Sequence, residues 1–454
     1  MPHARRFIFG PYRVDMDRST ITYTYYVDVD GGGRETYCDV VQFPGATRDM
    51  WKHIPKRLLT SLLESLCIMC GINYWKIHCA PEIVIEGFSL TREQAEFWDE
   101  VYTKGLGEFF YRSQIDFRGL ISFPYKTTWL PRQYSARFPR SARLLLLNGG
   151  GKDSIVSAEL LKARGMEFDL FALNPIGLQN KVAEKIGHPQ IVANRWSDQK
   201  RFYITEIKKV ASGFPSISTA TFIALLAAAL HDYRYVVLSN ESSADIGNLD
   251  YLGLSVNHQW SKSSESESLL GNYIRDFISP DVVQFSLLRQ LSEIEMVRQF
   301  VQYPSYLHSF SSCNMNFFKV HHNSEQRADH AYWCNECPKC VFIFGCLAAF
   351  LPKTAVVDIF GADLFDDQKL LPIFRNLLGI EGFKPFECVG TPEEMIVAMF
   401  RARQTGAYDG EPAMNLFSNY VLSNAGIPIE DMERRVFSAN SKDSIPEELR
   451  AALR

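Results

Sequence analysis

The stretch LLLLNGGGKDSIVSAELL, residues 144–161, predicts a buried strand that turns through three glycines directly into a helix. Four consecutive leucines are typical of a strand that is covered on both faces of a parallel sheet. Glycines let an anion approach the backbone N–H groups without a Cβ in the way. A helix that begins at Ser154 adds unpaired N–H donors and the positive end of its dipole. The turn therefore predicts an anion site, although a glycine-rich connection without a ligand would share the pattern.

The spacing of this loop excludes two common phosphate-binding motifs. A Walker A loop needs G-x-x-x-x-G-K-[ST], but Asp153 follows Lys152 and no glycine stands five positions before Gly151. The dinucleotide fingerprint G-x-G-x-x-G fails because the sixth position from Gly149 is Ser154. The stretch instead resembles the S-G-G-x-D-S loop of the ATP pyrophosphatases, which have an adenine-nucleotide α hydrolase fold, with Gly149 in place of the first serine.

That resemblance implies an ATP site with Mg²⁺, and it implies an adenylate and diphosphate as products. The residues assigned to the site are Gly149, Gly150, Gly151, Lys152, Asp153, Ser154 and Asn174. The backbone amides and the Ser154 hydroxyl would hold the pyrophosphate, Lys152 would neutralise charge, and Asp153 would hold Mg²⁺ or order the site. Asn174 ends the next predicted strand along the chain.

The segments around the loop predict an α/β fold with a doubly wound, mostly parallel sheet. From residue 143 onward, apolar strands such as EFDLFALN and YRYVVLSN alternate with helices, among them one near residues 198–211 and one at 219–231. Ligands of such sheets bind beyond the carboxyl ends of strands, where LNGGGKDS, LNPIG and SNESSAD lie. In the first third, STITYTYYVDVDGGGRETYCDVVQF predicts a hairpin.

We expect three regions along the chain. They are an N-terminal α+β domain over residues 1–135, the nucleotide-binding domain over 140–352, and a helical C-terminal region over 353–454. The N-terminal domain carries no motif of its own. We expect it to help bind a large substrate.

Composition and charge exclude several classes of partner. The chain has 454 residues and a formal net charge of −4, so nothing general favours nucleic acid or an anionic membrane. No apolar run of signal-peptide length opens it, and the longest apolar segment, TATFIALLAAAL at 219–230, is too short to span a bilayer. We therefore expect a cytoplasmic protein. Five cysteines in apolar or mixed sequence are interpreted as buried thiols, namely Cys67, Cys70, Cys79, Cys346 and Cys388.

Four other cysteines have the spacing of metal ligands. Cys334, Cys337 and Cys340 follow at two-residue intervals in WCNECPKC, and Cys313 lies upstream in SSCN. Four thiolates suit tetrahedral Zn²⁺ or an Fe–S cluster. A similar zinc-bound set in the 7-cyano-7-deazaguanine synthases, which belong to the ATP pyrophosphatase superfamily, favours a structural Zn²⁺. Reduced thiols without a metal are the alternative.

Six ordered segments resemble the UDP-N-acetylmuramoyl-L-alanyl-L-glutamate epimerases, which supply the D-glutamate of peptidoglycan by an alternative route. They are VVLSNESSADIGN, VNHQWSKSSESE, FSLLRQLSEIEMVRQF, SSCN, WCNECPKCVFIFGCLAAF and GFKPFECVGTPEE, within residues 140–400. The resemblance implies that ATP activates the α-carboxylate of the terminal L-Glu as an acyl-AMP. A base then takes the Cα proton, an acid returns a proton on the other face, and water releases AMP.

Inversion at Cα needs two proton-transfer groups or one mobile group. Glu241 and His258 join Lys152 and Asp153 as catalytic candidates, because they follow strands in polar segments and titrate usefully when their surroundings shift them. Candidates for binding the substrate's carboxylate or phosphates are Asn240, Lys262 and Arg289. A structural histidine, a helix-capping glutamate and salt-bridged basic residues are the alternatives. Cys313 could act as a base only if it were not a zinc ligand.

Two other kinds of function share the loop. One is a different adenylating ATP pyrophosphatase, such as a tRNA thiolase or a deazaguanine nitrile synthase. The near-neutral charge balance does not favour the basic surface that a tRNA substrate would need. The other is a nucleotide sensor without catalytic activity, which would bind ATP and release no diphosphate.

Overall fold

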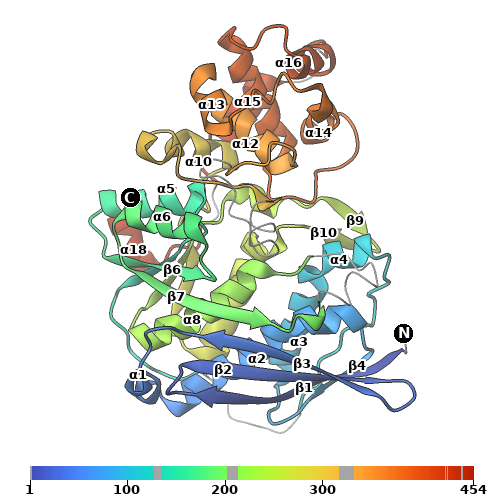
Figure 1. Cartoon of the computed structure of the whole chain (residues 1–454), viewed down its shortest axis with the longest axis vertical. Helices are drawn as coiled ribbons and strands as arrows, with labels where there is room; N and C mark the ends of the chain where they lie inside the picture. Colours follow the sequence, from blue (N-terminus) through green and yellow to red (C-terminus); the bar gives the residue numbers. More distant parts are fainter. Residues whose placement is uncertain are drawn as a thin grey trace.

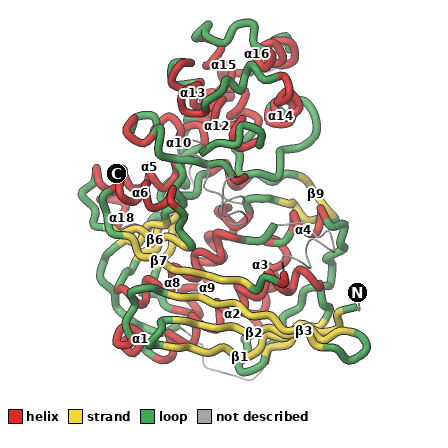
Figure 2. Tube along the Cα trace, viewed as in Figure 1, coloured by secondary structure: helices red, strands yellow, loops and turns green. Residues whose placement is uncertain are grey.

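The computed structural model describes residues 3–126, 135–201, 213–315, 332–424, 426, 428–440 and 443–453. Most of the helix predicted near residues 198–211, and part of the region in which the first domain boundary was expected, lie outside these residues. The described chain forms a mixed α/β fold with a large, mostly parallel sheet and many helices, as predicted. Figure 2 shows the strands gathered below a group of helices.

One nine-stranded sheet runs through the molecule in the order β11-β8-β5-β6-β7-β3-β2-β1-β4 (Figure 1). Its strands are β1 (Ala4–Asp15), β2 (Thr20–Val29), β3 (Arg34–Gln42), β4 (Glu82–Ile85), β5 (Leu144–Leu147), β6 (Phe168–Leu173), β7 (Gln190–Ser197), β8 (Tyr235–Leu238) and β11 (Val283–Ser286). A separate hairpin is formed by β9 (Leu249–Tyr251) and β10 (Leu254–Val256).

The parallel half of the sheet comprises β11, β8, β5, β6 and β7. Leu144, Leu145 and Leu146 of β5 are fully buried between neighbouring strands and helices, which explains the unbroken apolar run. The carboxyl ends of parallel strands lie at the same edge of a sheet. The glycine turn after β5, Asn174 after β6 and Asn240 after β8 therefore share one edge.

The N-terminal strands pair mainly in antiparallel fashion. The alternating sequence of β2 gives alternating half-buried and buried residues over most of the strand, as a sheet with one covered face requires. Gly31 and Gly32 adopt φ values of +87° and +85° in the turn that joins β2 to β3. The predicted hairpin is confirmed.

The two halves of the sheet join where β3 pairs with β7. Residues 39–42 of β3 run antiparallel to residues 194–197 of β7. At this junction Arg195 donates to both carboxylate oxygens of Asp39, at 2.9 and 2.8 Å. Strands from the expected N-terminal domain and from the nucleotide-binding region thus form a single sheet.

The longest helix, α2 (Lys56–His78), lies in the protein core. Its apolar stretch exceeds the 219–230 segment singled out from the sequence, and by length and composition α2 could cross a membrane. However, 83% of its most apolar window is buried inside the protein, and it packs on α8 (Ser216–His231). That packing is typical of a core helix.

The other α-helices of the described residues are distributed along the whole length of the molecule (Figure 1). They are α1 (Arg48–His53), α3 (Arg92–Gly105), α4 (Gly107–Arg112), α5 (Lys152–Ala163), α6 (Gly177–Ile186), α9 (Ser264–Tyr273), α10 (Glu293–Phe300), α12 (Pro338–Ala348), α13 (Lys353–Phe360), α14 (Leu371–Leu377), α15 (Pro392–Gln404), α16 (Pro412–Phe417), α17 (Ile429–Val436) and α18 (Glu447–Leu453). Helices α12 to α16 gather at the top of Figure 1. The chain end returns to the sheet, where Tyr235 donates to Glu448 at 3.0 Å.

Candidate active site

The glycine turn joins β5 to the N-terminus of α5 and borders open space. Gly150 has φ +74°, and its N–H donates to Asn148 Oδ1 at 3.0 Å. Gly151 caps α5 without any side-chain hydrogen bond, and a Cβ on Gly149 would meet no atom within 4 Å. Ser154 donates to the carbonyl of Gly151 at 3.0 Å. The loop therefore presents free backbone donors at a helix N-terminus, as an anion site requires.

A buried ion cluster lies directly beside this loop. Lys152, fully buried at the start of α5, donates to Asp153 and, at 3.0 Å, to Oε1 of Glu293. Lys339 of α12 donates to the same oxygen at 2.7 Å. Burial alone would raise the pKa of Glu293, but the two lysines hold it well below its usual range. Burial would lower the pKa of Lys152, yet Asp153 and Glu293 raise it above its usual value.

Glu241 brings a third carboxylate to the cluster from the end of β8. Burial raises its pKa to about 7, and the negative charge of Glu293 adds to this shift. One carboxylate oxygen from each of Asp153, Glu241 and Glu293 lies within 4.8 Å of the other two. Glu241 Oε2 and Glu293 Oε2 are buried and have no hydrogen-bond partner among the described residues. Oxygen ligands of this kind suit Mg²⁺.

The two asparagines at the strand ends differ in their contacts. Asn174 has φ +47°, and its side-chain amide bonds the backbone N–H and carbonyl of Arg195 at 2.6 and 2.8 Å. These contacts anchor the end of β6 to β7, and an ATP contact for Asn174 stays a prediction. Asn240 is 5% exposed, and its Nδ2 has no partner within the described part of the chain. The side chain of Asn240 is therefore available to a ligand.

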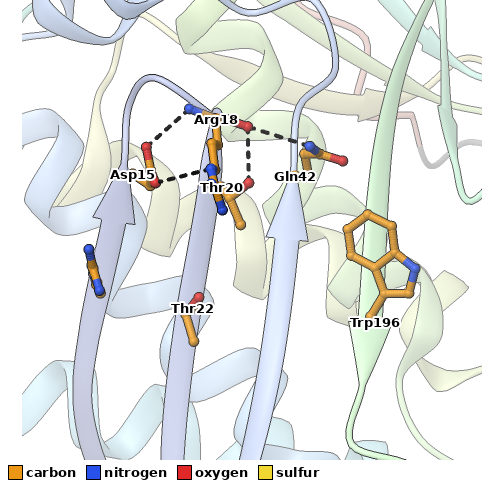
Figure 3. Close-up of a pocket in the computed structure, with 7 residues that line it drawn as sticks. Asp15, Arg18, Thr20, Thr22, Gln42 and Trp196 are labelled. Atoms are coloured by element: carbon orange, nitrogen blue, oxygen red, sulfur yellow. Dashed lines mark hydrogen bonds and ion pairs between the residues drawn. The ribbon is translucent and has the colours of Figure 1, made fainter.

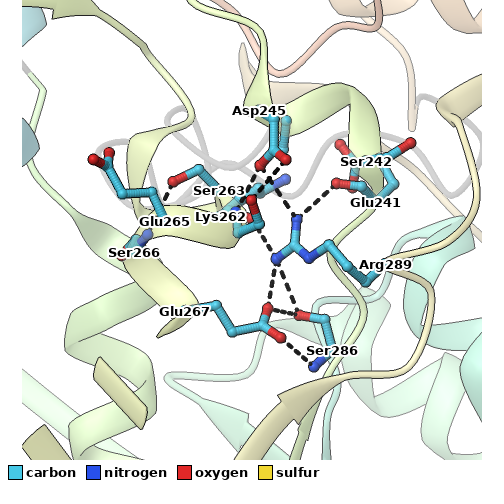
Figure 4. Close-up of polar contacts among 12 residues, drawn as sticks. Glu241, Ser242, Asp245, Lys262, Ser263, Glu265, Ser266, Glu267, Ser286 and Arg289 are labelled. Atoms are coloured by element: carbon cyan, nitrogen blue, oxygen red, sulfur yellow. Dashed lines mark hydrogen bonds and ion pairs between the residues drawn. The ribbon is translucent and has the colours of Figure 1, made fainter. Parts of the chain in front are cut away.

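Arg289 lies beneath the cluster and holds two neighbouring segments in place (Figure 4). Its guanidinium donates to the carbonyl oxygens of Glu241 at 2.9 Å and Lys262 at 2.7 Å, and to Glu267 Oε2 at 2.5 Å. Only 2% of Arg289 is exposed. These contacts position Glu241 and Lys262, while a direct contact of Arg289 with substrate stays a prediction.

Lys262 ends the short 3₁₀ helix η2 (Trp260–Lys262), between the carboxylate cluster and Cys388. Burial would lower the pKa of its ammonium, but the charges of Cys388 and Glu241 raise it above the usual value. No hydrogen bond from this ammonium to a described residue is found. Lys262 is thus a cation that interacts with two anionic groups and keeps its donors free for a third.

His258 lies in a second polar cluster that adjoins the first. Its Nδ1 is 2.5 Å from Glu108 Oε2, and its ring also hydrogen-bonds Cys388. Burial would lower the pKa of His258, but Cys388 and Glu108 raise it to about 10. Burial would raise the pKa of Cys388, but Lys262 and His258 lower it to about 6. The two shifts in pKa favour an imidazolium paired with a thiolate.

Sequence reasoning missed several members of these clusters. Cys388 was interpreted as a buried thiol, and Glu293, Lys339 and Glu108 were not singled out. Three of the four lie inside quoted segments: LSEIEMV holds Glu293, CPKC holds Lys339 and FECVG holds Cys388. A charged or reactive residue among apolar neighbours was the available signal. Glu108 lies in the helical GEFFYR and offered no such signal.

The four predicted metal-binding cysteines lie together. The sulfur atoms of Cys313, Cys334, Cys337 and Cys340 are all within 4.8 Å of one another. Cys340 Sγ is 3.7 Å from Cys334 Sγ and 3.5 Å from Cys337 Sγ. Zn–S bonds of about 2.3 Å place the sulfurs of a tetrahedral site roughly 3.8 Å apart. The cysteine set therefore fits a zinc ion.

An open depression of about 530 Å³ lies elsewhere, on the outer face of the sheet (Figure 3). It is lined by Arg13, Asp15, Arg18, Thr20, Thr22, Gln42 and Trp196. The carbonyl of Arg18 accepts from Thr20 at 3.0 Å and from Gln42 at 3.4 Å, and Trp196 is 51% exposed. Its polar groups are largely satisfied by neighbours, so it lacks the unpaired buried groups of the carboxylate cluster.

Two family models match this chain. Residues 1–287 match the MurL N-terminal domain, and residues 309–426 match the MurL C-terminal domain. The first match alone covers more than half of the chain. It includes the glycine turn, Glu241 and His258, and the second includes the four cysteines and Cys388.

Three curated relatives carry the same name, UDP-N-acetyl-alpha-D-muramoyl-L-alanyl-L-glutamate epimerase. The Micromonospora sp. protein is 33% identical over 92% of this chain and 91% of its own length. The Xanthomonas oryzae pv. oryzae protein is 37% identical over 74% of this chain and 73% of its own. The Salinispora tropica protein is 32% identical over 92% of this chain and 89% of its own.

Proposed function

This chain belongs to the family of UDP-N-acetyl-alpha-D-muramoyl-L-alanyl-L-glutamate epimerases, and we propose that it inverts Cα of the terminal L-glutamate of that substrate by way of an ATP-derived adenylate. The protein is an isomerase that acts on a UDP-muramoyl dipeptide in peptidoglycan precursor synthesis. The observation that carries the nucleotide part is the glycine turn with free N–H donors beside three carboxylates, of which Glu241 and Glu293 are buried.

The chemistry explains why an epimerase would use ATP. Removing the Cα proton next to an ionised carboxylate would place two negative charges side by side, so the barrier is very high without compensation. In the proposed reaction a carboxylate oxygen of the terminal glutamate attacks the α-phosphorus of ATP, and diphosphate leaves. The resulting mixed anhydride carries no carboxylate charge, so its Cα proton is more acidic. After inversion, water cleaves the anhydride and releases AMP.

We assign the parallel half of the sheet to the adenine-nucleotide α hydrolase type. In this assignment the amides of Gly149 and Gly151 bind the β and γ phosphates, and Gly150, whose N–H donates to Asn148, shapes the turn. Lys152 neutralises the charge of the phosphates. Support comes from the helix N-terminus that follows the turn and from the open space at Gly149. The same proposal includes Asn174 and Ser154, at the edge of this site, as predicted ATP contacts.

Asp153, Glu241 and Glu293 would hold Mg²⁺. A bound Mg²⁺ would neutralise phosphate charge. Support comes from the two buried carboxylate oxygens without partners, which would otherwise be costly. The buried lysines next to Glu293 offset part of the negative charge of the cluster. Asn240 and Lys262, with donors to spare, would bind the substrate carboxylate or a phosphate.

The four cysteines would hold a structural Zn²⁺. Their distances suit a closed tetrahedral site without an open position for substrate. Zinc would then fix Cys337 at the start of α12, the helix that carries Lys339 into the ion cluster. Metal analysis of the purified protein should find about one zinc per chain.

The N-terminal region, residues 1–135, would help bind the UDP-muramoyl part of the substrate. Support comes from Glu108 of α4, which reaches the site through His258. We keep a cytoplasmic location as part of the proposal, because α2, the one helix among the described residues that is long and apolar enough to cross a membrane, is buried in the core.

The proposal is tested by incubating the chain with ATP, Mg²⁺ and UDP-N-acetylmuramoyl-L-alanyl-L-glutamate in D₂O. We expect diphosphate and AMP in step with product, and deuterium at Cα of a D-glutamyl residue. Epimerisation without AMP formation would overturn the adenylation route. Neither epimerisation nor AMP formation would overturn the proposed function as a whole.

A further inference from the structure

Cys388 lies where three distant parts of the chain meet. It belongs to the segment between α14 and α15, His258 follows β10, and Glu108 belongs to α4. His258 bonds Glu108 through Nδ1 at 2.5 Å and also hydrogen-bonds the Cys388 sulfur. Arg112 holds the second oxygen of Glu108 at 2.9 Å. A reactive group, a partner and a third residue that orients the partner are the parts of an activated thiol.

The charges around the sulfur favour a thiolate. His258 and Lys262 are the cations that act on it most strongly, and Lys339 adds a third. The acidic groups nearby are Glu108, which is paired with His258, and Glu387, which accepts from Asn314. A thiolate among cations is reactive as a base, in contrast to a cysteine in an apolar core.

Charge interactions through Lys262 connect the same sulfur with the carboxylate cluster. Lys262 interacts with both Cys388 and Glu241 and so links the thiolate to the carboxylate cluster. Gln259 is 2% exposed and donates to the carbonyl of Val389, next to Cys388, while its Oε1 has no partner among the described residues. Asn240 Nδ2 and Glu241 Oε2 are likewise buried and unpartnered. Buried polar atoms without partners are costly, so these three atoms are candidates for contact with a polar ligand.

We propose that Cys388 is the base that takes the Cα proton of the activated L-glutamate and that Lys262 is the acid that returns a proton on the opposite face. The assignment rests on the proposed function. The Cα–H bond breaks as an S–H bond forms, and the electron pair moves from Cα onto the acyl oxygen. A proton then passes from the Lys262 ammonium to Cα, which gives the D configuration. Exchange with water restores the thiolate and the ammonium.

His258 and Glu108 are positioning residues in this scheme. The imidazolium donates to the sulfur and keeps it ionised and oriented, and Glu108 fixes the ring. A thiolate can accept the Cα proton without a metal contact, so the proton transfer remains separate from the phosphate chemistry at the glycine turn.

The test is Cys388→Ala in D₂O, with diphosphate release, Cα deuteration and stereochemistry measured on the same sample. We expect inversion and Cα deuteration to fall at least about 100-fold, since acid–base groups contribute 10²- to 10⁴-fold, while diphosphate release stays within a few fold. Cys67→Ala is the matched control, because Cys67 is fully buried in α2 and burial raises its pKa well above the usual value. The Cys67→Ala variant should release diphosphate, deuterate Cα and invert its substrate as the unchanged chain does.

Lys262→Met tests whether the two proton transfers take place on opposite faces of Cα. If Cys388 acts alone on one face, this variant should place deuterium in recovered L-glutamyl substrate without inverting it, because the thiol returns a deuteron to the side from which it took the proton. Retention of inversion within threefold in Cys388→Ala would overturn the proposal. So would a parallel fall of inversion and diphosphate release, which would indicate a structural role.

A second measurement keeps the proposal testable if Cys388→Ala does not fold. Iodoacetamide should alkylate Cys388 of the unchanged chain and abolish inversion, and substrate with ATP should protect it. An enzyme that still inverts its substrate after complete alkylation of Cys388 would overturn the assignment. Absence of inversion in the untreated, unchanged chain would instead overturn the proposed function and this assignment with it.

Discussion

The buried ion pair at the β3–β7 junction and the buried cluster beside the glycine turn both join distant segments, but only the first has a partner on each carboxylate oxygen. Asp39, fully buried, accepts two bonds from Arg195 and a third from Tyr74 at 2.9 Å. The cluster beside the glycine turn has Lys152 and Lys339 on one oxygen of Glu293 and leaves the other oxygen unpaired. Unpaired buried acceptors are costly, so a fold keeps them mainly where something else binds.

Residue type alone does not distinguish the structural cluster from the functional one. Both clusters contain a carboxylate and a long cation, and both are almost fully buried. The first cluster joins β3 to β7 and needs no further partner. The second leaves buried carboxylate oxygens unpaired, and in the proposed function a cation on the carboxylates and an anion on the glycine turn complete it. Four predictions follow this difference, from the largest effect to the smallest.

Arg195→Met should cause the largest change, and it should be a change in stability. It leaves the Asp39 carboxylate buried and without its cation, which costs about 3–5 kcal/mol. Urea unfolding measures the loss. Arg34→Met is the control, because its ion pair with Asp28 at 2.7 Å is half exposed and screened by solvent, so its loss should change the stability little. Equal losses in the two variants would contradict the structural role of the first cluster.

Lys152→Met should affect catalysis most. Removing a buried cation that stabilises phosphate charge lowers the rate by about 10²- to 10³-fold, or roughly 3–4 kcal/mol. Steady-state diphosphate release measures it. Lys162→Met on the same helix is the matched control, since Lys162 pairs with Glu159 in a partly exposed position and lies outside the site. Comparable loss in both variants would show that the effect is general to α5.

Mg²⁺ with ATP should stabilise the protein through the second cluster only. At a ligand concentration 100 times the dissociation constant, stabilisation is about 2.7 kcal/mol. Thermal unfolding should show an upward shift in the unchanged chain and in Arg34→Met. Glu241→Gln should lose most of the shift, because it removes a predicted metal ligand. An undiminished shift in Glu241→Gln would place the metal elsewhere.

The smallest effect concerns the pH dependence of Mg²⁺ affinity. Glu241 has a pKa of about 7 in the protein without metal, so its proton competes with the ion below that pH. The ionised fraction falls from roughly nine-tenths at pH 8 to one-tenth at pH 6, so affinity should weaken about tenfold on acidification, or about 1.3 kcal/mol. Titration calorimetry at the two pH values measures this. Glu241→Gln should flatten the dependence, and a dependence that persists would assign it to another group.

Local patterns predicted the elements well and the long-range contacts only in part. The unbroken leucines of β5, the three glycines and the following helix were predicted because all three are set by neighbouring residues. Glu241 and Lys152 were both candidates, and the parallel strands bring their segments to one edge. Cys388, Glu108 and His258 come from three regions far apart in sequence. No periodicity encodes their meeting, so the pairing of thiol and imidazole could not be predicted.

The β3–β7 junction also has a consequence for the order in which the chain folds. One edge of β3 pairs with β2, and residues 39–42 at its other edge can pair with β7 only after residues 194–197 have been synthesised. A ribosome synthesises the stretch between them in roughly 8–30 s at 5–20 residues per second. Throughout that time β3 presents an open strand edge, which is a template for pairing with other chains. The growing chain is thus most prone to aggregate before β7 emerges, and chaperone dependence should be concentrated in that interval of synthesis.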